Sequence, residues 1–158
     1  MATFFVNKAT VTNSLLKAAQ GSNDFLVRPD EMDLVTEVRV PVVTLDGFCA
    51  DRSLARIDLL KLDVQGFEIR ALEGARGLLG SGSVPFVYLE VSFVPTYEQQ
   101  PLFPEVYQYL FDRGYRLVWL YETGFHTHFY SVGANGLFVQ ESIGARRPRQ
   151  SARSPSDG

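Results

Sequence analysis

Five residues around two predicted strand ends could support chemistry. Asp63 closes an apolar run of the sequence, and Glu90 lies near the end of the next apolar run. The turn that follows Asp63 contains Gln65, Gly66 and Glu68. In open α/β sheets, ligands bind beyond the carboxyl ends of the strands, because loops and helix N-termini converge there. A carboxylate in such a place can hold a ribose hydroxyl, a cationic group or a metal, and it can accept a proton when its pKa is tuned.

The same residues also have purely structural interpretations. Asp63 can cap the helix that is expected to begin near Phe67, and Glu68 can complement the helix dipole from the first turn. Gly66 allows the backbone either to bend sharply or to approach a ligand closely. Position alone leaves both interpretations open.

Two further motifs give weaker signals. His126 and His128 face the same side of a predicted strand, which would supply half of a metal site. No third ligand stands at a matching spacing, so no metal site is predicted. The run Gly133-Ala134-Asn135-Gly136 could form a nucleotide loop, but its setting favours a hairpin turn. The sequence contains no Gly-x-Gly-x-x-Gly, Walker or Gly-x-Ser-x-Gly motif.

Several segments of the sequence have the hydrophobic pattern of β-strands. The apolar runs at residues 57–64 and 84–91 are nearly continuous, which is typical of parallel strands that are buried on both faces. Residues 35–43 alternate between apolar and polar side chains, and Thr44 then offers the N-cap of a short helix that ends near Ala50. Residues 8–34 are weakly patterned and are predicted to be mostly loop, with one short helix at 15–19.

Helical spacing follows at residues 67–79 and 103–111, and a strand is predicted at 115–121, before a terminal β-pair. Trp119 and the aromatic residues of the second helix are predicted to lie in the core. The alternation predicts an α/β domain over residues 1–144, with a mostly parallel sheet, right-handed crossovers and a C-terminal antiparallel hairpin.

Charge and composition exclude several classes of protein. The chain has 158 residues, 46% of them hydrophobic, and a net charge of −3. Residues 145–158 carry four arginines and one aspartate, a local charge of +3, which leaves −6 on residues 1–144. An acidic body argues against nucleic acid as the main partner. The basic segment has no aliphatic residue larger than alanine and is predicted to be a disordered tail.

Membrane and disulfide chemistry are also not expected. No apolar run reaches the roughly 18 residues that a membrane helix needs, and no signal peptide is visible at the start. The single cysteine, Cys49, cannot form an internal disulfide. A cytoplasmic location is therefore the expectation.

Several motifs in a fixed order resemble the FkbM-type methyltransferase family, whose hallmark is similar to "VPVxTLD … IDLLKIDVEGxExxVLxGA". The matching stretches are Val40-Pro41-Val42-Val43-Thr44-Leu45-Asp46, Ile57-Asp58-Leu59-Leu60-Lys61-Leu62-Asp63-Val64-Gln65-Gly66-Phe67-Glu68 and Ala71-Leu72-Glu73-Gly74-Ala75. Further support comes from Val87-Tyr88-Leu89-Glu90, Asp112-Arg113-Gly114-Tyr115 and Gly136-Leu137-Phe138-Val139. The resemblance covers roughly residues 3–140.

The resemblance implies a Rossmann-like, class I fold and S-adenosylmethionine-dependent methylation of a hydroxyl oxygen on a small molecule or sugar. Asp63 and Glu68 would be the catalytic acidic positions, and Glu90 would bind the acceptor. Asp63, Gln65 and Gly66 would border the cofactor. No metal, nucleic-acid or membrane partner is implied.

The chain also departs from the family pattern. The family's glycine loop, similar to "DVGANxG", is not found upstream of Thr3, so the cofactor cradle is missing and the domain is expected to be N-terminally truncated. Gln65 replaces the acidic residue that is usual in "DVEG". The alternative is a catalytically inactive remnant or interaction module, which would form a homodimer through an exposed sheet edge. An unrelated α/β hydrolase or sugar-binding domain is the third reading.

Overall fold

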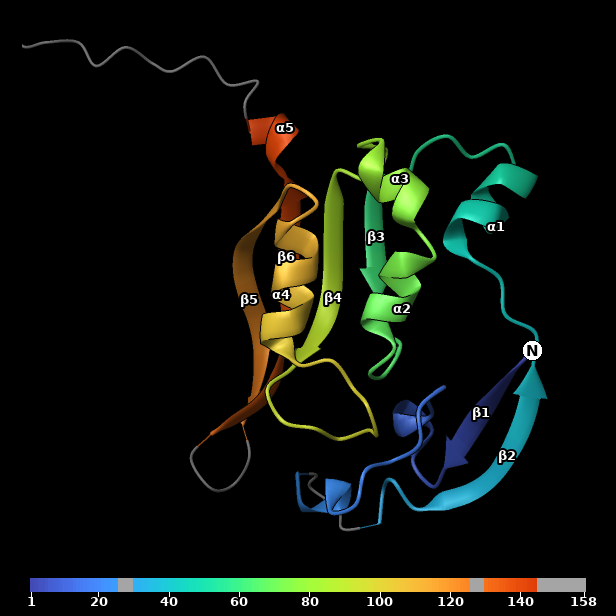
Figure 1. The fold of residues 1–158 in the computed structure, drawn as a ribbon. Helices are drawn as coiled ribbons and strands as arrows, with labels where there is room; N and C mark the ends of the chain where they lie inside the picture. The colour runs from blue at the N-terminus through green and yellow to red at the C-terminus, as the bar shows by residue number, and fades with distance from the viewer. Residues whose placement is uncertain (26–29, 126–129, 145–158) are drawn as a thin grey trace, which may run out of the picture.

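Two β-sheets organise the chain in the computed structural model, which describes residues 1–25, 30–125 and 130–144 (Figure 1). The smaller sheet pairs β1 (Ala2–Asn7) antiparallel with β2 (Leu34–Val40). The larger sheet has four strands in the order β3-β4-β6-β5. These strands are β3 (Leu59–Leu62), β4 (Phe86–Ser92), β5 (Tyr115–Phe125) and β6 (Ser131–Gln140).

The larger sheet is mixed rather than mostly parallel, which corrects the sequence prediction. Strands β3 and β4 pair in parallel, whereas β6 pairs antiparallel with both β4 and β5. The reason is that β6, which follows β5 along the chain, lies between β4 and β5 and pairs antiparallel with both. The α/β class is confirmed, and three of the four strands still run in the same direction. The C-terminal antiparallel pair is β5 with β6, and not the predicted hairpin that turns at residues 133–136.

Helices cover one face of this sheet. The helices are α1 (Leu45–Asp51), α2 (Glu68–Glu73), α3 (Arg76–Gly80), α4 (Phe103–Phe111) and α5 (Glu141–Gly144). In Figure 1, α2, α3 and α4 lie over the same side of the strands. The core forms between them, and its most deeply buried large side chains include Leu72, Leu79, Leu89, Leu110 and Phe138.

The opposite face of the sheet is uncovered in the described part of the chain. Leu59 of β3 is 55% exposed and Trp119 of β5 is 65% exposed. The burial of β3 therefore alternates, with Leu60 and Leu62 buried and their neighbours exposed. The predictions that β3 and β4 are buried on both faces and that Trp119 lies in the core are wrong, because the helices of the described residues pack on only one side of the sheet.

The run of glycines in β6 corrects another prediction. Residues 133–136 lie inside β6 and do not form a hairpin turn or a nucleotide loop. A side-chain carbon at Gly133 would lie 2.9 Å from the carbonyl oxygen of Val91 in β4. Glycine is therefore needed here so that the two strands can pack closely.

The connection between β1 and β2 is irregular. It contains short 3-10 turns at Thr10–Thr12 and Ser22–Phe25, and the predicted helix at 15–19 does not form. Instead, Ala18 pairs with Tyr97 in an isolated bridge, and Glu98 N–H donates to the carbonyl of Lys17. Residues 8–25 and 30–33, here called the N-terminal connection, therefore run beside the loop that follows β4.

Two predictions fall outside the described residues, namely the histidine pair at 126 and 128 and the tail at 145–158. No helix in the described part of the chain is long and apolar enough to cross a membrane.

Candidate functional site

The turn after β3 is held in an unusual backbone conformation. Gln65 has φ +50° and Gly66 has φ +91°, both in the left-handed region that favours glycine. For a non-glycine residue this conformation costs about 1–2 kcal/mol. The carbonyl oxygen of Gln65 accepts a 2.6 Å hydrogen bond from Ser14 Oγ, which ties the turn to the N-terminal connection.

The side-chain amide of Gln65 brings two predicted site residues together. Its Nε2 donates to Asp63 Oδ1 at 2.9 Å and to Glu90 Oε2 at 2.9 Å. The Tyr97 hydroxyl lies 2.9 Å from Gln65 Oε1. The neutral residue that departs from the family pattern is therefore the group that bridges the two carboxylates.

The two bridged carboxylates differ in environment. The side chain of Asp63 is 55% exposed, and Lys61 Nζ lies 3.5 Å from its Oδ2. Glu90 is half-buried on β4, and burial raises the pKa of its carboxyl, as does the charge of Asp63 to a smaller extent. The hydrogen bond from Gln65 opposes this rise in the pKa of Glu90. Glu90 therefore holds a proton more readily than an ordinary glutamate.

Glu68 lies beneath the turn and faces backbone. It is 4% exposed, and its Oε1 accepts long hydrogen bonds from Gly66 N–H at 3.3 Å and Val64 N–H at 3.4 Å. Burial raises the pKa of Glu68 to about 7, with a smaller contribution from the charge of Glu90. In this position Glu68 supports the backbone that carries Asp63 and Gln65.

Gly66 supports the same turn by its small size. A side-chain carbon there would lie 3.1 Å from the Tyr97 ring and 3.2 Å from both Gln100 and Leu16. The space beside Gly66 is thus filled by protein. The predicted contact of Gly66 with a cofactor stays a prediction.

A small pocket of about 110 Å³ opens at this cluster. Its polar groups come from Gln65, Glu90, Ser92, Thr96 and Tyr97. Thr12, Phe25, Met32, Val132 and Gly133 complete the lining. The pocket lies near the carboxyl end of β4, beside the N-terminal connection, and it can take a small polar group.

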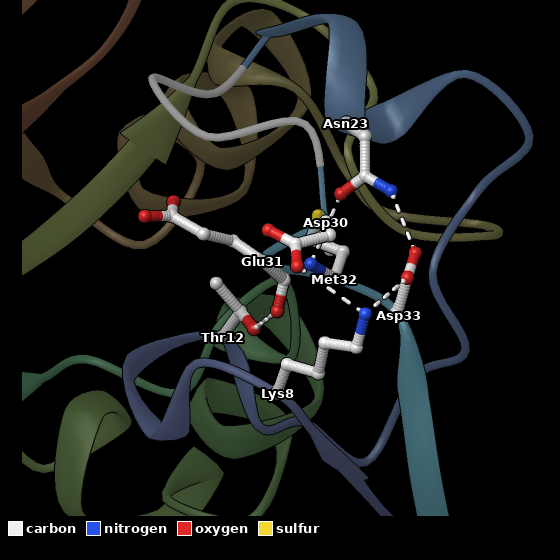
Figure 2. A network of polar contacts seen from close by, with 7 residues as sticks. All are labelled: Lys8, Thr12, Asn23, Asp30, Glu31, Met32 and Asp33. Carbon is white, nitrogen blue, oxygen red and sulfur yellow. Dashed lines mark hydrogen bonds and ion pairs between the residues drawn. The ribbon is translucent and has the colours of Figure 1, made fainter.

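Salt bridges and hydrogen bonds hold the part of the N-terminal connection that lines this small pocket. Figure 2 shows Lys8 between Asp30 and Asp33, with its Nζ 3.2 Å and 2.9 Å from their carboxylates. Asn23 Oδ1 accepts from Met32 N–H at 3.0 Å. Thr12 Oγ1 lies 3.1 Å from the carbonyl oxygen of Glu31 (Figure 2). Thr12 and Met32 of the pocket lining are therefore held by one polar network.

A larger pocket of about 440 Å³ borders the same turn. Val64 and Phe67 contribute to it from the turn, together with aliphatic residues that precede and begin α1. Arg70 and Glu73 of α2 are the charged residues of its lining. No group of three or more possible metal ligands was found among the described residues.

A model of the methyltransferase FkbM domain matches residues 2–117. The chain therefore belongs to the FkbM methyltransferase domain family, as its motifs predicted. Searches of the curated proteins and of the solved structures gave no match.

Membership of this family implies an S-adenosylmethionine-type cofactor. The larger pocket, at about 440 Å³, reaches the size of roughly 300–1,000 Å³ that is usual for small-molecule sites, and the smaller pocket does not. Its apolar wall suits a purine ring or a methyl group, and Arg70 and Glu73 suit the charged ends of an amino acid. The residues present therefore fit such a cofactor at the larger pocket. Its lining does not include Asp63, Gln65 or Gly66, so their predicted contact with the cofactor stays a prediction.

Proposed function

We propose that the chain is an S-adenosylmethionine-dependent methyltransferase that acts on a hydroxyl oxygen of a small molecule or sugar. The observation that carries this proposal is the bridge from Gln65 to Asp63 and Glu90 at the rim of a small polar pocket. Family membership supports the methyl-transfer chemistry, and the polar lining supports an acceptor that bears hydroxyl groups.

Each acidic residue has a distinct role in the proposal. Glu90 lines the pocket and binds the acceptor hydroxyl, which it orients by accepting a hydrogen bond. Asp63, which is more exposed, stands at the end of β3 and takes the hydroxyl proton as the oxygen–methyl bond forms and the sulfur–methyl bond breaks. Glu68 acts through the turn that it supports, and the cofactor supplies an electrophilic methyl group when bound.

Asp63→Asn tests this assignment. We expect micromolar S-adenosylmethionine binding to the wild-type chain by calorimetry, and loss of methyl transfer to a panel of glycosides and polyols in the variant. Because the Asp63 side chain is largely exposed, its free energy of unfolding should change by less than about 0.5 kcal/mol. Asp58→Asn, which alters another exposed aspartate near β3, is the control. Equal transfer by Asp63→Asn and wild type would remove Asp63 from its role.

A second candidate function is an interaction module that forms a homodimer. In the described residues, β3 pairs with β4 on one side and with no strand on the other. A free strand edge can pair with another chain. No heat at millimolar cofactor, together with a dimer in sedimentation equilibrium, would favour this function over methyl transfer.

A further inference from the structure

Tyr97 occupies a central place in the site, although no sequence motif marks it. The residue is 3% exposed. Its hydroxyl oxygen lies 2.9 Å from Gln65 Oε1 and 3.0 Å from the carbonyl oxygen of Thr12. Since a hydroxyl has one proton, these two acceptors share it. Tyr97 thereby links the turn after β3 to the N-terminal connection.

The contact with Tyr97 bears on which way the Gln65 amide points. If the amide were reversed, its oxygen would face the carboxyl oxygens of Asp63 and Glu90, and these acceptors would receive no hydrogen bond from it. In the observed orientation, the NH₂ group faces both carboxylates and the oxygen faces the hydroxyl donor of Tyr97. Burial also raises the pKa of the Tyr97 phenol, which keeps this donor protonated at neutral pH.

We propose that Tyr97 is a positioning residue, whose hydroxyl fixes the Gln65 amide so that its NH₂ group spans Asp63 and Glu90. Ser14 fixes the same residue from the other side, through the backbone carbonyl of Gln65. The two anchors hold a residue whose backbone is in the left-handed region. The inference rests on the proposed function only for the roles of the two carboxylates.

The proposal has a consequence for Glu90 that can be measured without cofactor or acceptor. The titratable groups around its carboxyl are Asp63, Lys61, Glu68 and Tyr97. The hydrogen bond from Gln65 lowers the pKa of Glu90. If the amide loses its anchor on Tyr97, it can rotate and withdraw this donor, and the pKa of Glu90 should then rise.

The test is a pH titration of the side-chain carboxyl carbons by NMR, on the full chain without ligand. In Tyr97→Phe we expect the midpoint of Glu90 to rise by about 0.5 pH unit or more relative to wild type. Tyr115→Phe is the matched control, because it removes another buried tyrosine hydroxyl, which donates to the carbonyl of Val84 at 2.6 Å. An unchanged Glu90 midpoint in Tyr97→Phe, or an equal shift in the control, would overturn the proposal.

A second measurement needs no variant and covers the case in which Tyr97→Phe fails to fold. In the wild-type chain, the two Gln65 side-chain NH₂ protons should be distinct, protected from exchange and sensitive to the titration of Glu90. Averaged, rapidly exchanging signals would refute a fixed amide. Both measurements are made without S-adenosylmethionine, so failure of cofactor binding would sink the proposed function and leave this inference standing.

Discussion

Glu68 is a buried acid whose charge is costly to the fold. Its pKa in the folded chain is about 7, above the ordinary value of 4.5 that applies when the chain is unfolded. The folded state therefore keeps a proton that the unfolded state loses between these two values. The resulting stabilisation is complete below about pH 4.5 and is lost as the pH rises through 7.

Glu68→Gln should therefore stabilise the chain at pH 8 and have little effect at pH 4.5. The amide keeps an oxygen for the N–H groups of Gly66 and Val64 but carries no charge. The gain in the free energy of unfolding should reach on the order of 3 kcal/mol. Urea unfolding at the two pH values measures it, with Glu73→Gln, an exposed change on the same helix, as the control. A gain that does not depend on pH would contradict this account of Glu68.

At the scale of residues, the sequence identified the acidic groups of the site but not the groups that hold them. Asp63 and Gln65 could be found because they follow the end of β3, and Glu90 because it lies near the end of β4, where α/β sheets carry their sites. Tyr97 and Ser14 lie 32 and 51 residues from Gln65 and belong to irregular segments. Local periodicity carries no information on such contacts, since they depend on how distant loops fold together.

At the scale of elements, a residue of α1 caps the N-terminus of α3. Thr44 is the predicted N-cap of α1, and its Oγ1 accepts from Gly47 N–H at 3.1 Å, which confirms the prediction. Asp46, two residues on, accepts from Gly77 N–H at 2.8 Å and Leu78 N–H at 3.0 Å. The carboxylate therefore caps the first turn of α3, which is a different helix from its own.

Asp46→Ala should lower the free energy of unfolding by about 1 kcal/mol, because both N–H groups of α3 lose their acceptor. Urea unfolding at pH 7 measures the change. Asp51→Ala removes an exposed aspartate from the same helix α1 and should cost much less. Equal losses in the two variants would show that the cap across the helices adds no stability.

The strands show what an apolar run can and cannot predict. The positions of β3 and β4 follow from the runs at 57–64 and 84–91, although β3 is shorter than its run. Exposure of one face could not be predicted, because a continuous run does not reveal whether both faces have a covering layer. The helix predicted over 67–79 also divides into α2 and α3, at Gly74 and Ala75.

For the molecule as a whole, the order of elements along the chain was predictable and their order in the sheet was not. Alternating strands and helices fix the α/β class. The insertion of β6 between β4 and β5 depends on pairing between strands more than 40 residues apart, such as Val87 with Phe138. The local hydrophobic pattern of each strand does not indicate which distant strand it pairs with.

We expect self-association, because within residues 1–25, 30–125 and 130–144 the outer edge of β3 pairs with no strand and one face of the sheet is uncovered. Leu59→Lys should weaken it, because lysine on an edge strand opposes pairing with another chain. Sedimentation equilibrium over a range of concentrations measures the dissociation constant. Val11→Lys, which changes another exposed apolar residue outside the four-stranded sheet, is the control. If Leu59→Lys and wild type associate equally, the edge and the face around it are not the interface.

The uncovered face carries Trp119, which is the only tryptophan of the sequence and is 65% exposed. Its intrinsic fluorescence therefore comes from one known place on one known surface. Emission at long wavelength and ready quenching by acrylamide should mark the bare face. A chain or ligand that binds over this face should bury Trp119 and shift its emission to shorter wavelength. The fluorescence of Trp119 therefore reports binding to the uncovered face of the sheet.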